Sequence, residues 1–171
     1  MQIKHTFIGP LVAATAGLSP NLQAKEVTWD THDAIEVGVG VANPGAIDDT
    51  YVFTLIDPAV LYASAVANNL NSTFDVTDGK VSLMREGGNG AADQLIADFA
   101  FDGTSGDLTK NFGQLAAGDY FYRISGAAAG RTGGVYSITS EVVPVPEPAT
   151  AAMASAAALL LLALGSRRNR D

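Results

Sequence analysis

The side chains with the widest chemical scope in this sequence are carboxylates that occur in close pairs. They are Asp30/Asp33, Asp48/Asp49, Asp75/Asp78 and Asp102/Asp107. Two carboxylates suffice for glycoside hydrolysis, and hard cations such as Ca²⁺ also bind carboxylate oxygens. Most of these residues lie in turn sequences, where Asp is favoured because its side chain bonds the local backbone. We therefore expect structural turns, with Asp75, Asp78, Asp102 and Asp107 as first candidates for calcium and no catalytic acid.

Histidine and cysteine chemistry is restricted by composition. The chain has no Cys and two His, of which His5 lies in an N-terminal segment considered below. Cysteine–histidine catalysis and a multi-histidine zinc site are therefore excluded for the rest of the chain. A Ser-His-Asp triad would need His32, and no Gly-x-Ser-x-Gly sequence is present. We predict that His32 is a solvated loop residue and that the protein is not an enzyme.

Charge separates the middle of the chain from its ends. Residues 25–147 hold 6 basic and 17 acidic side chains, a net charge of −11. The remaining cations are Lys4, Arg167, Arg168 and Arg170. The positive-inside rule predicts that both ends start in the cytoplasm and that the acidic middle lies outside. An acidic domain also argues against nucleic acid as a partner, because nucleic acid requires basic patches.

The N-terminus has the pattern of a secretory signal peptide. A short positive region, Met1–His5, is followed by a mostly apolar run over residues 6–18 and by small and polar residues up to Ala24. This order predicts a signal peptide over residues 1–24, cut after Ala24. Residues 25–143 then form one exported domain, which must rely on its hydrophobic core because the chain has no Cys for disulfides.

The C-terminus combines a proline segment, an apolar span and a basic stop. Prolines recur from Val143 to Pro148, the next 17 residues (149–165) are uncharged, and Arg167, Arg168 and Arg170 follow. As a helix the span would be about 26 Å long, close to the roughly 30 Å of a bilayer's hydrocarbon core. We expect a single transmembrane helix with its arginines on the cytoplasmic side.

This tail, residues 144–171, resembles a PEP-CTERM sorting signal. The resemblance is carried by Val145, Pro146, Glu147 and Pro148, by the span directly after them, and by the arginines as stop signal. It implies a Gram-negative bacterium, export, transient anchoring in the inner membrane, and processing by an exosortase near Pro-Glu-Pro. A permanent C-terminal anchor is the alternative. A sortase substrate of the Gram-positive type would need Leu-Pro-x-Thr-Gly, which is absent.

The middle of the chain predicts an all-β fold, an antiparallel β-sandwich of about eight strands. Short strands alternate with turns rich in Gly, Asn and Asp, and no amphipathic helix precedes Ala149. The expected strands cover residues 26–29, 34–41, 47–55, 60–70, 73–76, 80–85, 95–101, 120–126 and 135–142. In residues 34–41, four β-branched side chains alternate with Glu and Gly, which indicates a half-buried strand. Asp78-Gly79 predicts a type I′ hairpin turn.

The strand region also resembles the FxDxF subfamily of PEP-CTERM proteins. Asp49 takes the Asp position in Ile47-Asp48-Asp49-Thr50-Tyr51, and residues 115–120, 125–126 and 133–136 fit the later half of the pattern. The subfamily implies a β-rich exported domain and no established activity.

These observations predict a non-catalytic protein that is exported, displayed at the cell surface or released, and associated with extracellular matrix or exopolysaccharide. The alternative is a carbohydrate- or calcium-binding surface module held by a permanent membrane anchor. A third possibility, a small glycoside-active enzyme, rests on the paired carboxylates alone.

Overall fold

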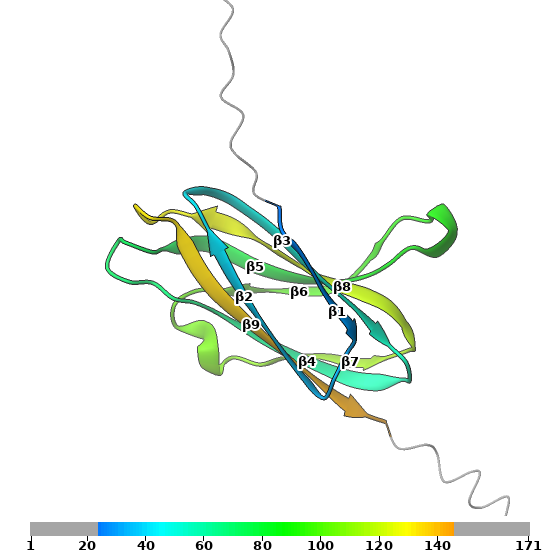
Figure 1. Ribbon diagram of the computed structural model, residues 1–171. Coiled ribbons are helices and arrows are strands. Elements are labelled where there is room, and N and C mark those ends of the chain that lie inside the picture. Colours follow the sequence, from blue (N-terminus) through cyan, green and yellow to red (C-terminus); the bar gives the residue numbers. More distant parts are fainter. Residues whose placement is uncertain (1–23, 146–171) are drawn as a thin grey trace, which may run out of the picture.

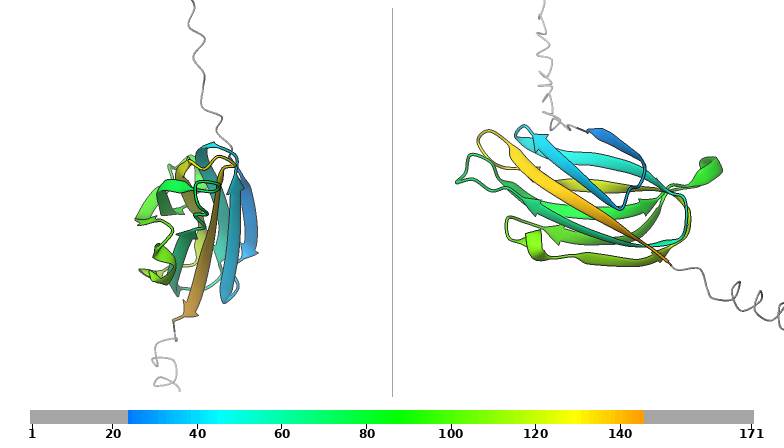
Figure 2. Two further views of the ribbon diagram at one scale, coloured as in Figure 1. Left: turned by 90° about the vertical axis from the view of Figure 1, so that its left-hand side faces the viewer. Right: turned by 60° about the horizontal axis from the view of Figure 1, so that its bottom comes forward.

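The computed structural model describes residues 24–145, which form two β-sheets packed face to face (Figure 1). A five-stranded sheet has the order β1-β3-β8-β5-β6 and a four-stranded sheet the order β2-β9-β4-β7. The strands are β1 (Glu26–Thr31), β2 (Ile35–Ala42), β3 (Gly45–Leu55), β4 (Ala59–Ala67), β5 (Val76–Arg85), β6 (Gln94–Phe101), β7 (Lys110–Leu115), β8 (Gly118–Ala128) and β9 (Gly134–Pro144). Two short 3₁₀ turns, η1 (Gly88–Gly90) and η2 (Ser105–Asp107), lie in connections between strands. Figure 2 shows the two layers from two further directions.

The predicted all-β sandwich is confirmed, with some differences in detail. The described residues form nine strands, including β7, which the sequence analysis did not predict. All pairings are antiparallel except that of β1 with β3, which is parallel. Within residues 24–145 no helix is long and apolar enough to cross a membrane. The predicted transmembrane span, residues 149–165, lies outside this range.

The core combines large side chains on β3 with mostly small side chains on β4. On β3, the alternation of residues places Tyr51, Phe53 and Leu55 inside, as the sequence predicts. On β4 the inward positions are Leu61 and the alanines 59, 63, 65 and 67. Large residues opposite small ones allow two sheets to interdigitate without voids. The alanine-rich β4 is therefore a strand, although its composition also suited a short helix.

On β2 the apolar residues face solvent and the glycines face the core. Ile35, Val37, Val39 and Val41 are 61%, 60%, 53% and 68% exposed. A Cβ atom added to Gly38 would lie 2.3 Å from the Tyr51 ring, and one added to Gly40 would lie 2.0 Å from the Tyr136 ring. The two tyrosine rings occupy the space that inward side chains of β2 would need. The strand is half-buried as predicted, but its buried face is the glycine face.

The predicted hairpin at Asp78-Gly79 is wrong, because these residues lie inside the continuous strand β5. The strand pairs with β8 on both sides of them, Thr77 opposite Ala127 and Lys80 opposite Ser125, with a register shift between. Two residues opposite one form a β-bulge. Asp78 has a positive φ of 53°. A type I′ turn would need a positive φ at both residues, and here only Asp78 has one. Gly79 fits the bulge because a Cβ atom there would lie 2.6 Å from the Phe101 carbonyl oxygen. The same residue pair suits both structures, so the local sequence does not distinguish them.

Replacing Gly40 by Ala tests the packing of β2 on the tyrosines. Overfilling a close-packed core costs typically about 1–3 kcal/mol, and we expect Gly40→Ala to lower the unfolding free energy by that amount. The same substitution at Gly88 is the matched control, because nothing lies within 4 Å of its added Cβ. Urea unfolding followed by tyrosine and tryptophan fluorescence measures both variants. Equal stability of the two would contradict the packing described.

Candidate functional site

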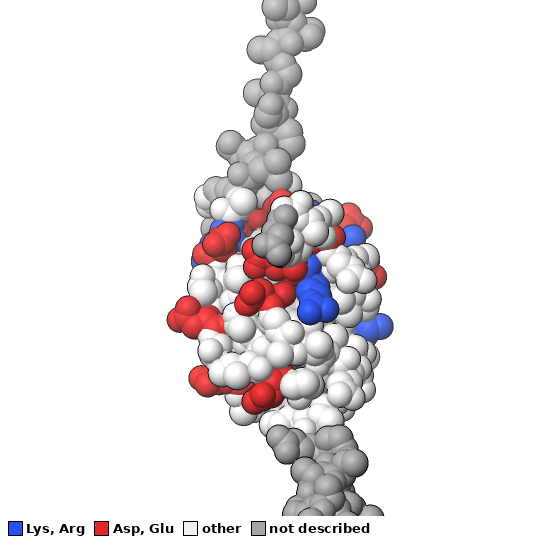
Figure 3. All heavy atoms as spheres, turned by 90° about the vertical axis from the view of Figure 1, so that its right-hand side faces the viewer, with Lys and Arg blue, Asp and Glu red and all other residues white. Residues whose placement is uncertain are grey.

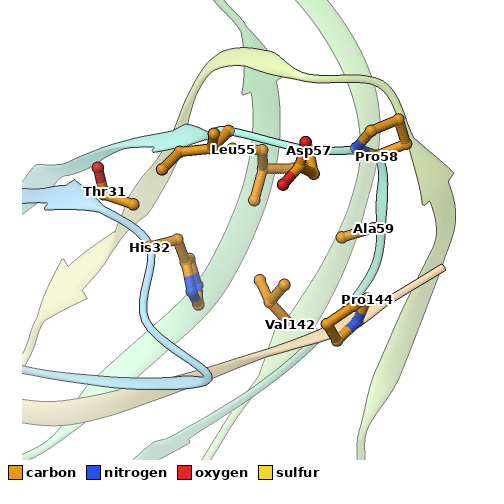
Figure 4. A pocket seen from close by; sticks show the side chains of 9 residues that line it. Thr31, His32, Leu55, Asp57, Pro58, Ala59, Val142 and Pro144 are labelled. Carbon is orange, nitrogen blue, oxygen red and sulfur yellow. The ribbon is translucent and has the colours of Figure 1, made fainter. Parts of the chain in front are cut away.

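A small cavity lies at the end of the sandwich where β9 finishes (Figure 4). We call this the exit end; it carries the connections 32–34, 56–58, 86–93 and 116–117. The cavity measures about 160 Å³ and is lined by Thr31, His32, Leu55, Ile56, Asp57, Pro58, Ala59, Val142 and Pro144. The Val145 N–H donates to the Pro58 carbonyl oxygen at 3.4 Å. The first residue of the predicted sorting motif is therefore bonded to the domain beside this cavity.

His32 is buried, so the prediction of a solvated loop residue is wrong. It is 8% exposed, and its ring makes edge-on contacts with Trp29 and Phe53. Nδ1 is bonded to the Asp33 carbonyl oxygen, which can only accept, so Nδ1 carries the proton. Nε2 then accepts from the Ser140 hydroxyl at 2.7 Å. Asp residues on both sides suggested exposure, but rings of Trp29, three residues upstream on β1, and of Phe53 on β3 bury the histidine.

The serine–histidine pair has the geometry of a structural link. Ser140 has 0% exposure, and its oxygen also lies 2.8 Å from the Tyr122 hydroxyl, so it cannot reach a substrate. Nδ1 of His32 meets a backbone carbonyl, where a catalytic triad would place a carboxylate. The cavity is also smaller than the roughly 300–1,000 Å³ of most ligand pockets. The pair ties the β1–β2 connection to β9 and β8.

Burial shifts the pKa values of two members of this network, His32 and Tyr122. Burial lowers the pKa of His32, partly opposed by its hydrogen bond to the Asp33 carbonyl and by the Glu36 and Asp33 carboxylates. Burial raises the pKa of Tyr122, partly opposed by its hydrogen bond to Ser140. Both groups are therefore held in their neutral forms at pH 7.

Trp29 belongs to the aromatic core. Its ring centroid lies 5.1 Å from that of Tyr51, and it also contacts Phe53 and Tyr122 at 6.2 and 6.1 Å. A single tryptophan can pack in a core or act as a stacking platform for a sugar, and the sequence does not decide between the two. The contacts support packing.

Asp49, the residue in the Asp position of the FxDxF-like motif, has a structural environment. It is 4% exposed, accepts a hydrogen bond from the Tyr136 hydroxyl, and accepts the Lys25 N–H at 3.1 Å. Ile47 and Tyr51, the flanking motif positions, point to the same buried side of β3. The motif therefore joins β3 to β9 and to the start of the domain.

The four calcium candidates lie in two connections and a bulge. Asp75 precedes β5, Asp78 is in its bulge, Asp102 precedes η2, and Asp107 is the last residue of η2. Asp102 accepts two hydrogen bonds from Thr104, its N–H and its hydroxyl, each at 2.7 Å, and these lower the pKa of Asp102. Among residues 24–145 no three or more His, Cys, Asp or Glu side chains gather closely enough to hold a metal ion. Calcium binding stays a prediction.

Acidic residues crowd the exit end. Asp33, Asp57, Glu86, Asp93 and Asp119 lie in or next to its connections. Figure 3, which views the molecule from the right-hand side of Figure 1, shows the red carboxylates of this region. The end of the domain nearest the sorting motif therefore carries negative charge.

A shallow groove crosses the outer face of the five-stranded sheet. It consists of two hollows of about 460 and 360 Å³ that share Asp93 and Phe121. Its apolar part is Phe121 with Met84 and Leu95, and its polar rim consists of Glu26, Thr50, Lys80, Ser82, Glu86, Asp98, Arg123 and Ser125. The Gly87 N–H holds the Asp93 carboxylate at 3.0 Å. The sequence alone shows no sign of this groove, because its residues come from five strands and one connection between strands.

Comparisons with known proteins add only general similarity. No family model and no curated protein sequence matches the chain. The pre-peptidase C-terminal domain of a collagenase from Bacillus anthracis matches 70% of this chain and 95% of its own, at 14% identity and a TM-score of 0.43. The Yersinia pseudotuberculosis-derived mitogen matches 66% of this chain and 89% of its own, at 17% identity and a TM-score of 0.41. Similarity at this level carries no functional inference.

Of the predicted sorting residues, only Val145 lies in the described range. Pro146, Glu147, Pro148, Arg167, Arg168 and Arg170 lie outside it. The sorting role of all seven stays a prediction from the sequence.

The buried neutral His32 predicts acid destabilisation of a fragment of residues 24–145, in which it is the only histidine. Below about pH 6.5 the unfolded chain takes up a proton that folded His32, with its lowered pKa, does not. The unfolding free energy should therefore fall as the pH drops from 7.5 to 5.5, by up to about 1.4 kcal/mol per unit.

The control is His32→Gln, which lowers stability at pH 7.5 and removes this histidine-dependent slope. Urea unfolding of both proteins across the pH range separates the effect from carboxylate titration, which the two share. Parallel pH profiles would contradict the assignment.

Proposed function

We propose that this protein is a non-catalytic exported protein, sorted through the PEP-CTERM and exosortase pathway and associated with extracellular matrix or exopolysaccharide. One structural observation supports it. β9, an inner strand of its sheet, ends at Pro144, and the motif begins at the next residue. A cut within or after Pro146–Pro148 would leave every strand of the sandwich in place.

The position of the motif suits a processing enzyme in a membrane. Val145 is tied to Pro58 at the exit end, so the domain and the predicted span are separated by only a few residues. Prolines in this short connection lack backbone donors and favour an extended chain, which keeps it open to a protease. The acidic exit end is repelled by anionic lipid headgroups within about a Debye length, roughly 8 Å at physiological salt. Repulsion of this kind holds the domain off the membrane surface and leaves the motif accessible.

Replacing the motif tests sorting. We expect the triple variant Pro146→Ala, Glu147→Ala, Pro148→Ala to stay folded, because the sandwich ends before it, and to remain in the membrane fraction. Pro144→Ala is the matched control: it changes a proline two positions upstream, outside the motif, and release should be normal. Fractionation of native cells with detection of the domain measures both. Normal release of the triple variant would overturn the sorting role.

The intact mass of released protein tests the same pathway independently. With the native exosortase present we expect a species that begins near Lys25 and ends near Pro146. Without the enzyme the domain should stay in the membrane and retain Arg170. A species that keeps Arg170 in the membrane under both conditions would mean a permanent anchor, the alternative that the sequence left open.

The outer groove favours a second candidate function, carbohydrate binding. An exposed aromatic face flanked by carboxylates and an arginine is the combination that holds a sugar ring, through apolar contact with its C–H face and hydrogen bonds to its hydroxyls. Phe121 is half-buried in the floor, and Arg123 at the rim is fixed by a bidentate pair with Asp48 at 2.6 and 2.8 Å. The groove thus offers an ordered polar rim around an apolar centre.

A glycan-binding measurement with Phe121→Ala tests this candidate. If the groove binds polysaccharide, the variant should retain less than a tenth of the binding of the unaltered protein to native exopolysaccharide, with its unfolding midpoint little changed. Leu108→Ala, an exposed apolar truncation outside the groove, should bind normally. Equal binding by all three proteins would rule the groove out while leaving the sorting proposal untouched.

A further inference from the structure

The two outer faces of the sandwich differ in chemical character. The outer face of the five-stranded sheet carries ion pairs, Arg123 with Asp48 and Lys80 with Asp98. The edge of the four-stranded sheet instead presents an apolar stripe, which we define as Ile35, Val37, Val39 and Val41 of β2. Each of the four is more than half exposed. Four adjacent β-branched side chains in solvent are unusual for a domain with a net charge of −11, and such patches commonly mark contact surfaces.

The strand that carries the stripe is also the most regular sheet edge of the described chain. The four edge strands are β1, β6, β2 and β7. Register shifts interrupt the pairing of β1 with β3, β6 with β5, and β7 with β4. The eight residues of β2 pair with β9 without interruption. Irregular pairing hinders the addition of another strand at a sheet edge, whereas a long regular edge strand can readily pair with one.

The backbone N–H and C=O groups of the stripe residues point toward the open edge of the sheet. The Val142 N–H donates to the Ala34 carbonyl, so Ala34 and the even-numbered residues after it direct their bonding groups to β9. The odd-numbered residues, which are those of the stripe, therefore direct their N–H and C=O groups away from β9. A partner strand along this edge would satisfy these backbone groups and would place the partner's side chains beside those of the stripe.

We propose that two copies of this chain associate through antiparallel pairing of their β2 strands, forming one continuous eight-stranded sheet. A two-fold axis at Gly38 places Val37 opposite Val39 and Ile35 opposite Val41 of the partner copy. In this register each stripe residue meets another stripe residue, and β-branched pairs across antiparallel strands are favourable. A two-fold axis at any other residue leaves some stripe residues of one copy without a stripe residue opposite them. With the axis at Gly38, the edge is complementary to itself.

Charge places no direct obstacle to a second copy at this edge. The two domains repel each other over most of their surfaces, and the stripe contains no charge. The one cation at the edge is Lys25, whose Nζ lies 3.4 Å from the Val39 carbonyl oxygen. Its side chain is exposed and can move aside, and as a cation between two acidic domains it lessens their repulsion.

The contact area indicates weak association. A strand of eight residues is about 27 Å long, and over the roughly 10 Å between sheets it offers about 270 Å² per copy. This is well below the roughly 800 Å² per partner of a standard stable interface, so the strand pairing alone does not give a stable dimer in dilute solution. We therefore expect pairing where copies are concentrated, as on a membrane or in a matrix, and test it there by cross-linking.

The absence of cysteine allows a direct test on the full chain. Val39→Cys in cells that express the complete protein should give a covalent dimer with a short bismaleimide, because residues diagonal across paired strands lie about 7–8 Å apart. Leu108→Cys is the control of similar exposure, 65% against 53% for Val39, and should stay monomeric. Adding Val37→Lys to Val39→Cys places a charge in the pairing and should reduce the dimer at least fivefold.

Other outcomes overturn the proposal. A Val39→Cys chain that reacts with a monofunctional maleimide but forms no dimer has a free edge. Protection from that reagent without a dimer, or a cross-link to a different protein, means that another partner covers β2. An equal yield of cross-linked dimer from Leu108→Cys would mean that the copies meet through unspecific contacts. The cross-linking assay does not require processing by an exosortase. A negative result would therefore overturn the pairing of β2 strands without bearing on the sorting proposal.

Discussion

The packing of two tyrosine rings against two glycines is the constraint on which the rest of the structure depends. Tyr51 and Tyr136 fill the space above Gly38 and Gly40, so β2 can lie close to the opposite sheet only with glycine at these two positions. The Tyr136 hydroxyl also binds the buried Asp49. Burial raises the pKa of Tyr136, and its hydrogen bonds to Asp49 and to Tyr51 raise it further, so the phenol stays a hydrogen-bond donor. One cluster thereby joins β2, β3 and β9.

The outward apolar stripe of β2 follows from this cluster. A strand with glycine on its buried face draws little stability from side-chain burial and is held mainly by its backbone pairing with β9. Its β-branched residues still favour the extended backbone, because they prefer strands whichever way they face. A sequence suited to β structure can therefore leave its apolar residues free for contact with a second molecule.

If the sorting proposal holds, the exit end combines structural and sorting roles in one place. His32, Ser140 and Tyr122 tie the connections there to β9, which fixes the strand up to the residue before the motif. The acidic connections around it lie on the side that would face a membrane. A sorting signal of this type needs no binding site on the domain. It needs a folded domain whose last strand is held in place up to the signal. The hydrogen bonds among His32, Ser140 and Tyr122 hold β9 in this way.

The sequence by itself determined the features that depend on short-range chemistry. These are the all-β class, most strand positions and the inward face of β3. The proposed sorting signal in the tail is likewise a linear pattern, which can be recognised without a folded context. Tertiary structure alone decided which face of β2 is buried, because hydrophobic alternation cannot show that tyrosines from β3 and β9 fill the space. It also decided that Asp78-Gly79 forms a bulge, since both candidate geometries use the same residues. His32 is buried only because rings from β1 and β3 close over it, and the groove around Phe121 exists only where separate strands meet.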